Sequence, residues 1–130
     1  MCKNDLFEYA VIRIVPRVER EEFLNTGVVV YCAAQRFLEV RYCINSDRIR
    51  ALHAEADPAE ISALLQAFEQ ICKGEKNCNS PIAALPIAER FRWLTATRST
   101  IVQCSQVHPG LTPDALQTLQ KIFSQQVDCG

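Results

Sequence analysis

Two apolar runs separated by only four residues constrain the fold of this chain more than any other feature. The first is Val28-Val29-Val30-Tyr31-Cys32, and the second extends from Phe37 to Ile44. β-Branched and aromatic residues favour strands. Two strands joined by so short a connection must run antiparallel, because a parallel crossover needs a much longer link. We therefore predict a β-hairpin that turns near Ala34-Gln35 and pairs Cys32 with Phe37.

This register sorts the side chains of the hairpin onto two faces. One face is almost wholly apolar and holds Val29, Tyr31, Leu38, Val40, Tyr42 and Ile44. The other face mixes apolar residues with Glu39 and Arg41. A slip by one residue would turn the whole apolar set toward water, so the pattern specifies the register. We expect helices to cover the apolar face.

A further strand is predicted before the hairpin, over Phe7 to Val15, because its side chains alternate between two largely apolar sets. Arg13 interrupts one of these sets, and Pro16 ends the strand since it has no N–H for a ladder hydrogen bond. Gly27, at the start of the next strand, indicates a β-bulge or a close approach of two backbones.

Capping signals predict the helices. Asp57-Pro58-Ala59-Glu60 combines an N-cap, a proline at the first helical position and a capping-box glutamate. Apolar residues then follow at helical spacing until Gly74. A short helix is expected after Ser46-Asp47, and a final helix after Thr112-Pro113-Asp114.

The order of these elements defines the fold class. Ser99 to Ser105 has the pattern of a later strand, whereas residues 85–98 fit either a helix or a strand. We predict an α+β fold with an antiparallel sheet of about four strands: a three-strand N-terminal meander plus the later strand. Two or three helices should pack on one face. Residues 1–130 are expected to form a single domain.

Composition and charge argue against several classes of protein. No apolar run approaches the roughly 20 residues of a membrane helix, and the N-terminus lacks an apolar signal core. We therefore expect a cytoplasmic protein without a membrane partner. The net charge of −1 supplies no field that would attract nucleic acid, so such a partner is not expected.

The seven cysteines are odd in number and no export signal accompanies them. This favours reduced, buried thiols over a disulfide framework. No C-x-x-C pair is present and the two histidines lie far apart in sequence, so we predict no metal site and no cofactor.

The segment from Arg90 to Gln103 is the richest in chemistry, with three arginines, the single Trp and several hydroxyls. Interleaved arginine and aromatic side chains bind anions and ring systems. We predict a site for a protein partner or an anionic ligand that combines two arginines of the sheet with residues of this segment and beyond. Its members are Arg13, Arg41, Arg92, Arg98, Ser99, Thr100 and His108.

Catalysis is the competing interpretation. The chain has no phosphate-binding glycine loop and no nucleophile elbow, which favours a non-catalytic module over an enzyme. The candidates for an acid or base are His108, Glu39 and Glu22, which would suit a small hydrolase or a metal-dependent nuclease. A third interpretation is a structural oligomerisation module, such as a homodimer.

Two stretches carry a resemblance to a known family. The first is Tyr9-Ala10-Val11-Ile12-Arg13-Ile14-Val15-Pro16, followed by Glu22, Phe23, Asn25, Gly27, Val28 and Val29. The second comprises Arg90-Phe91-Arg92-Trp93-Leu94-Thr95, Arg98-Ser99-Thr100 and Val107-His108-Pro109-Gly110-Leu111. Together they resemble a bacterial family of uncharacterised proteins, domain of unknown function 3037, although Thr97 stands where the pattern has Pro.

This resemblance implies a small cytoplasmic bacterial protein. Members of the family are often encoded near kinase-like proteins of the HipA type, which implies such a kinase as a partner. The resemblance implies no activity, cofactor or catalytic residue.

Overall fold

A computed structural model describes residues 4–20, 22–78, 80–96, 98 and 100–127. In chain order the elements are β1 (Asp5–Ile14), η1 (Val18–Arg20), β2 (Leu24–Cys32), β3 (Phe37–Tyr42), α1 (Ser46–Leu52), α2 (Pro58–Lys73), η2 (Pro81–Ala84), α3 (Ile87–Thr95), β4 (Val102–Cys104), β5 (His108–Thr112) and α4 (Ala115–Gln126), where η denotes a short 3-10 helix.

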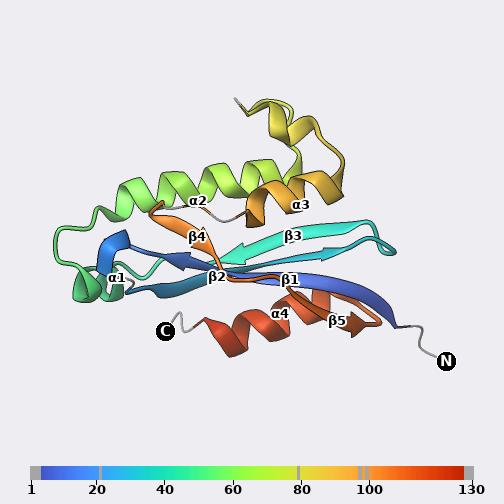
Figure 1. Ribbon diagram of the computed structural model, residues 1–130, viewed down its shortest axis with the longest axis horizontal. Coiled ribbons are helices and arrows are strands. Elements are labelled where there is room, and N and C mark those ends of the chain that lie inside the picture. Colours follow the sequence, from blue (N-terminus) through green and yellow to red (C-terminus); the bar gives the residue numbers. More distant parts are fainter. Residues whose placement is uncertain (1–3, 21, 79, 97, 99, 128–130) are drawn as a thin grey trace.

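The strands form one antiparallel sheet in the order β3-β2-β1-β4, and β5 continues along β1 beyond β4 (Figure 1). The predicted α+β class and the three-strand meander are confirmed. The hairpin register is also as predicted, with Cys32 opposite Phe37.

A β-bulge lies where the sequence indicated one. Ile12 pairs with Gly27 but Arg13 pairs with Asn25, which leaves Thr26 as the extra residue of β2. A Cβ on Gly27 would lie 2.7 Å from the carbonyl oxygen of Arg41, so only glycine fits this close approach between β2 and β3.

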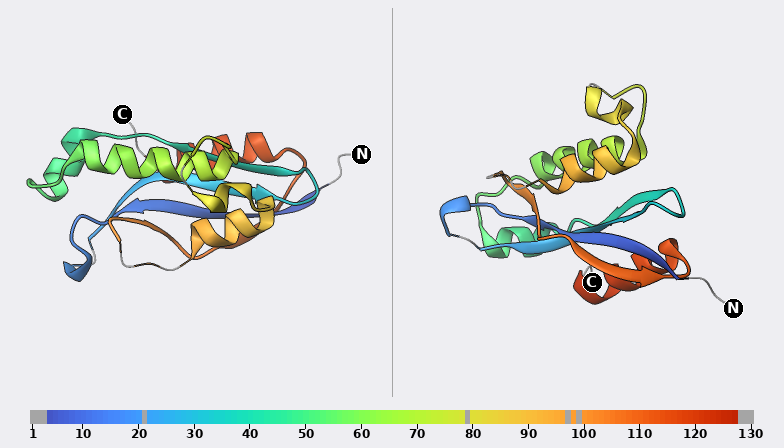
Figure 2. Two further views of the ribbon diagram at one scale, coloured as in Figure 1. Left: turned by 90° about the horizontal axis from the view of Figure 1, so that it is seen from above. Right: turned by 45° about the vertical axis from the view of Figure 1, so that its right-hand side comes forward.

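Helices cover both faces of the sheet. Helices α2 and α3 lie side by side on one face, and α4 lies on the other (Figures 1 and 2). The first two pack on the face that the sequence predicted as the core, where Ala10, Ile12, Ile14 and Val29 are fully buried. Under α4, the fully buried residues of β2 are Val28, Val30 and Cys32. The mixed face of the hairpin is therefore a second core, because α4 supplies its own apolar stripe.

The predicted N-caps of α2 and α4 and the glycine end of α2 are formed. Asp57 accepts a hydrogen bond from Ala59 N at 3.0 Å, and Gly74 ends α2 with a left-handed φ of 69°. Asp114 caps α4 by accepting from Leu116 N. Residues 85–98, for which the sequence allowed two conformations, contain helix α3.

The Pro109-Gly110 pair that follows His108 does not form a turn. Both residues lie in strand β5, where Pro109 pairs with Glu8 and Gly110 with Phe7. Proline is tolerated there because β5 is an edge strand, whose outer side needs no N–H donor. An added Cβ on Gly110 would lie 2.6 Å from the Phe7 ring, so the glycine makes room for a buried aromatic side chain.

The expectation of reduced cysteines holds for four thiols and is wrong for one. Cys32, Cys72, Cys78 and Cys104 are free, whereas Cys43 is disulfide-bonded. Cys32 is free and is therefore not the partner of Cys43. Within the described residues, no helix is long and apolar enough to cross a membrane.

Candidate functional site

A groove of about 230 Å³ lies between α2, the end of α3 and β4. Its lining is mostly apolar. The described lining residues are Leu64, Ala67, Phe68, Ile71, Trp93, Leu94, Ala96, Arg98, Thr100, Val102, Gln103 and Cys104. Two of the apolar side chains are large and still accessible to solvent, since Leu64 is 40% exposed and Trp93 38% exposed.

The way α3 ends positions the charged residue of this groove. Phe91 and Leu94 are buried against the core, which turns Trp93 toward the groove and solvent. The chain leaves the helix at Ala96, and Arg98 then folds back over the last turn. Its guanidinium lies 3.8 Å from the centre of the Trp93 ring and donates a hydrogen bond to the Trp93 carbonyl oxygen. A cation at a helix C-terminus is favourable, and a cation–π contact adds to it.

Polar groups complete the rim next to Arg98. The Thr100 hydroxyl donates to Val102 O at 2.7 Å, and the Gln103 side-chain nitrogen donates to Thr100 O at 2.8 Å. The Cys104 thiol donates to Leu94 O at 3.5 Å. Burial raises the pKa of Cys104 to about 12, and this outweighs the opposing effect of Arg98 and Arg13. The thiol therefore stays protonated at neutral pH and is a poor nucleophile.

The predicted site residues divide between the two faces of the sheet. Arg98 and Thr100 both line the groove on the α2–α3 face. Arg13, Arg41 and His108 lie on the face that carries α4, where each contacts an aromatic ring. Ser99 lies outside the described residues. The structure therefore brings two members of the predicted site together and places the sheet arginines elsewhere.

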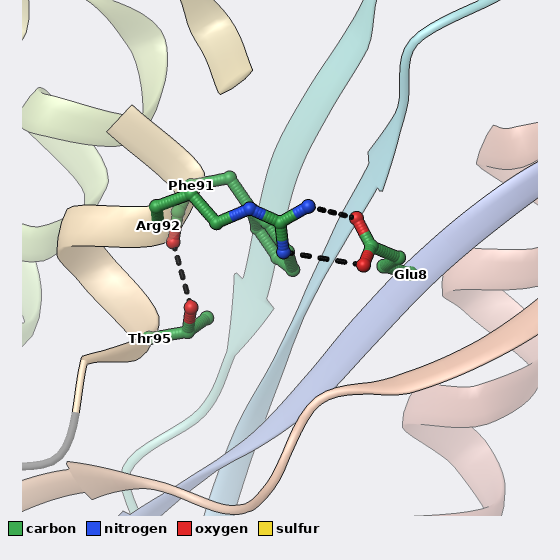
Figure 3. Close-up of polar contacts among 4 residues, drawn as sticks. All are labelled: Glu8, Phe91, Arg92 and Thr95. Atoms are coloured by element: carbon green, nitrogen blue, oxygen red, sulfur yellow. Dashed lines mark hydrogen bonds and ion pairs between the residues drawn. The ribbon is translucent and has the colours of Figure 1, made fainter. Parts of the chain in front are cut away.

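Arg92 is engaged within the protein. Its two terminal nitrogens donate to the two carboxylate oxygens of Glu8 at 3.1 and 2.9 Å (Figure 3). This bidentate pair connects α3 to β1, while the neighbouring Phe91 stacks on Tyr31 at 5.2 Å between ring centres. Thr95 closes the helix by donating its hydroxyl to Phe91 O at 2.8 Å. The pair lies beside the buried Phe91 and Leu94, which hold α3 on the sheet.

Arg13 and Arg41 each lie against a phenylalanine. The Arg13 guanidinium is 4.2 Å from the centre of the Phe23 ring, and that of Arg41 is 5.1 Å from the centre of the Phe123 ring. The Nε of Arg13 is buried and makes no hydrogen bond within the described part of the chain.

The candidate acids and base are well separated. His108 pairs with Tyr9, Tyr9 with Val30 and Val30 with Glu39. Three strand spacings lie between His108 and Glu39, or about 14 Å. Glu22 forms an ion pair with Arg20 at 2.9 Å. Glu22 lies beyond the Ile14 end of β1. Ile14 is five residues from Tyr9 along this strand, which adds a separation of roughly 17 Å from the His108–Tyr9 pair. With these separations, no two of the three side chains contact the same substrate atom.

The groove includes residues that sequence reasoning did not select. Leu64 belongs to the apolar helical pattern that ends at Gly74, and Cys104 belongs to the predicted strand from Ser99 to Ser105. Gln103 was noted only as the end of the arginine-rich segment. Two features of the sequence pointed to this groove. Leu64 lies at the margin of the apolar stripe of its helix, and Trp93 and Arg98 are close together in sequence.

The fold and the groove define a small α+β domain in which one antiparallel sheet lies between helices. The sequence comparison gives the family: residues 9–127 match the family described as Protein of unknown function (DUF3037). The chain therefore belongs to that family, as the resemblance predicted. No curated protein and no solved structure matches the chain.

Proposed function

We propose that this chain is a non-catalytic binding module that recognises a protein partner through the groove between α2, α3 and β4. The observation that carries the proposal is the exposure of Leu64 and Trp93 in an apolar groove whose only charged residue, among the described ones, is Arg98. Large apolar side chains left accessible beside an arginine are typical of the centre of a protein interface.

Two further observations support binding rather than catalysis. The predicted acids and base lie far apart, and the thiol within the groove is held protonated by burial. The family resemblance suggests a HipA-like kinase as the first partner to test. In this proposal the protein acts in the cytoplasm, where such a kinase would meet it.

The test uses a matched pair of leucines. Leu64 lies in the groove and Leu116 lies on α4, and both are exposed, so Leu64→Asp and Leu116→Asp should both fold. We expect a purified HipA-like kinase from the same genome to bind the wild-type chain and Leu116→Asp equally by calorimetry. Leu64→Asp should weaken binding at least about tenfold, since a buried carboxylate in an apolar interface costs more than 1.4 kcal/mol. If both variants bind equally, the groove is not the binding site. If the wild type does not bind, the HipA-like kinase is not the partner.

The catalytic alternative has its own test. The wild-type chain should not hydrolyse phosphoesters or short RNA and DNA with added Mg²⁺ or Mn²⁺. Turnover that disappears in His108→Ala or Glu39→Gln would overturn the non-catalytic proposal, because such groups act mainly in the transition state.

A further inference from the structure

Arg98 brings a charge into the groove without a counter-charge. Its guanidinium has five N–H donors, and its one hydrogen bond within the described residues is to the Trp93 carbonyl oxygen. Its other contact is the face of the Trp93 ring, so most of its N–H donors make no hydrogen bond within the described residues. No acidic residue is among the described lining residues. A half-buried arginine fork that is already held in one orientation suits a planar carboxylate, which accepts two parallel hydrogen bonds.

The size of the groove limits what it holds. An apolar cavity of roughly 150 Å³ is enough for a benzene molecule. The groove of about 230 Å³ therefore has room for one large apolar side chain rather than several. The ligand must then carry its carboxylate close to that single side chain.

The last residue of a polypeptide meets both requirements. It bears an apolar side chain and a carboxylate on the same Cα, whereas in an extended internal segment the neighbouring side chains point to the opposite face.

We infer that the groove binds the carboxyl-terminal residue of a partner protein, with its apolar side chain against Leu64 and Trp93 and its carboxylate on Arg98. This inference rests on the proposed function, because it names the part of the partner that occupies the same groove.

The experiment compares fluorescein-labelled hexapeptides that end in Leu, Phe or Val, each made as the free acid and as the C-terminal amide. Fluorescence anisotropy with the wild-type chain should show at least one free acid that binds ten or more times more tightly than its amide. Arg98→Gln should bring the acid and the amide to within about twofold of each other. Arg41→Gln, which changes an exposed arginine on the α4 face, should retain the full preference.

Arg98→Lys provides a second variant that keeps the charge at the end of α3. It should lose most of the preference for the free acid, since lysine presents a point charge without the planar fork. Thermal melts of each variant establish that the protein remains folded.

Three results would overturn the inference. The first is that the acid and amide forms bind the wild type equally. The second is that an amidated peptide with an internal Asp binds more tightly than any free acid. The third is that none of the peptides binds. The kinase test with Leu64→Asp is independent of all three, so a partner that uses an internal segment would still support the proposed function.

Discussion

At the scale of single residues, burial decides which thiols can react. Cys72 is a buried residue of α2 and Cys104 lines the groove, and burial raises the pKa of each from 9.0 to about 12. The thiolate is the reactive form, so both groups should resist alkylation at pH 8, whereas the half-exposed Cys78 should react. Peptide mapping after iodoacetamide treatment measures this, with a urea-unfolded sample as the control. Rapid labelling of Cys104 in the folded protein would mean that the floor of the groove is open to solvent.

The same two thiols make stability depend on pH in the alkaline range. Because their pKa is higher in the folded state than in the unfolded state, their contribution to stability is complete below about pH 9. It is lost progressively as the pH rises toward 12. Cys104→Ser, which carries no titrating thiol, should show a smaller loss of thermal stability between these pH values than the wild type. An unchanged slope would contradict the raised pKa of Cys104.

At the scale of elements, α4 tests whether the second core contributes to stability. Leu119 is 3% exposed beneath this helix, and Leu116 on the same helix is 46% exposed. Leu119→Ala should destabilise the protein by about 2–5 kcal/mol because it opens a cavity against β2. Leu116→Ala should change stability by less than about 0.5 kcal/mol. Urea denaturation measures both, and equal effects would show that α4 does not pack as described.

At the scale of the whole molecule, β1 and β2 contribute residues to both cores, which should make unfolding cooperative. Trp93 reports on the α2–α3 side through its fluorescence, while circular dichroism reports on all the elements. We expect the two transitions to coincide, as for a single domain. They should also shift together in Leu119→Ala, although that substitution lies on the opposite side of the sheet from Trp93. Separate transitions would mean that the chain contains two units that unfold independently.

Local sequence patterns were sufficient for the hairpin, its register and the caps of α2 and α4. In each case the deciding interaction joins residues close in sequence, as in the turn between Cys32 and Phe37 or the cap between Asp57 and Ala59. The family was also readable from sequence, because its motifs are themselves local strings.

The groove needed the tertiary structure, because its walls come from segments about thirty residues apart, at Leu64 and Trp93. The sequence singled out Arg98 and Thr100 by residue type but grouped them with Arg13 and Arg41. Alternation along a strand shows which residues share a face, but it does not show which helix covers that face. Strand β5 likewise depends on β1, since its Pro-Gly pair favours a turn unless a partner strand and the Phe7 ring hold it extended. The sequence by itself therefore determined the elements and the family, whereas long-range packing decided that α4 builds a second core and that Arg98 meets Leu64 and Trp93 in one groove.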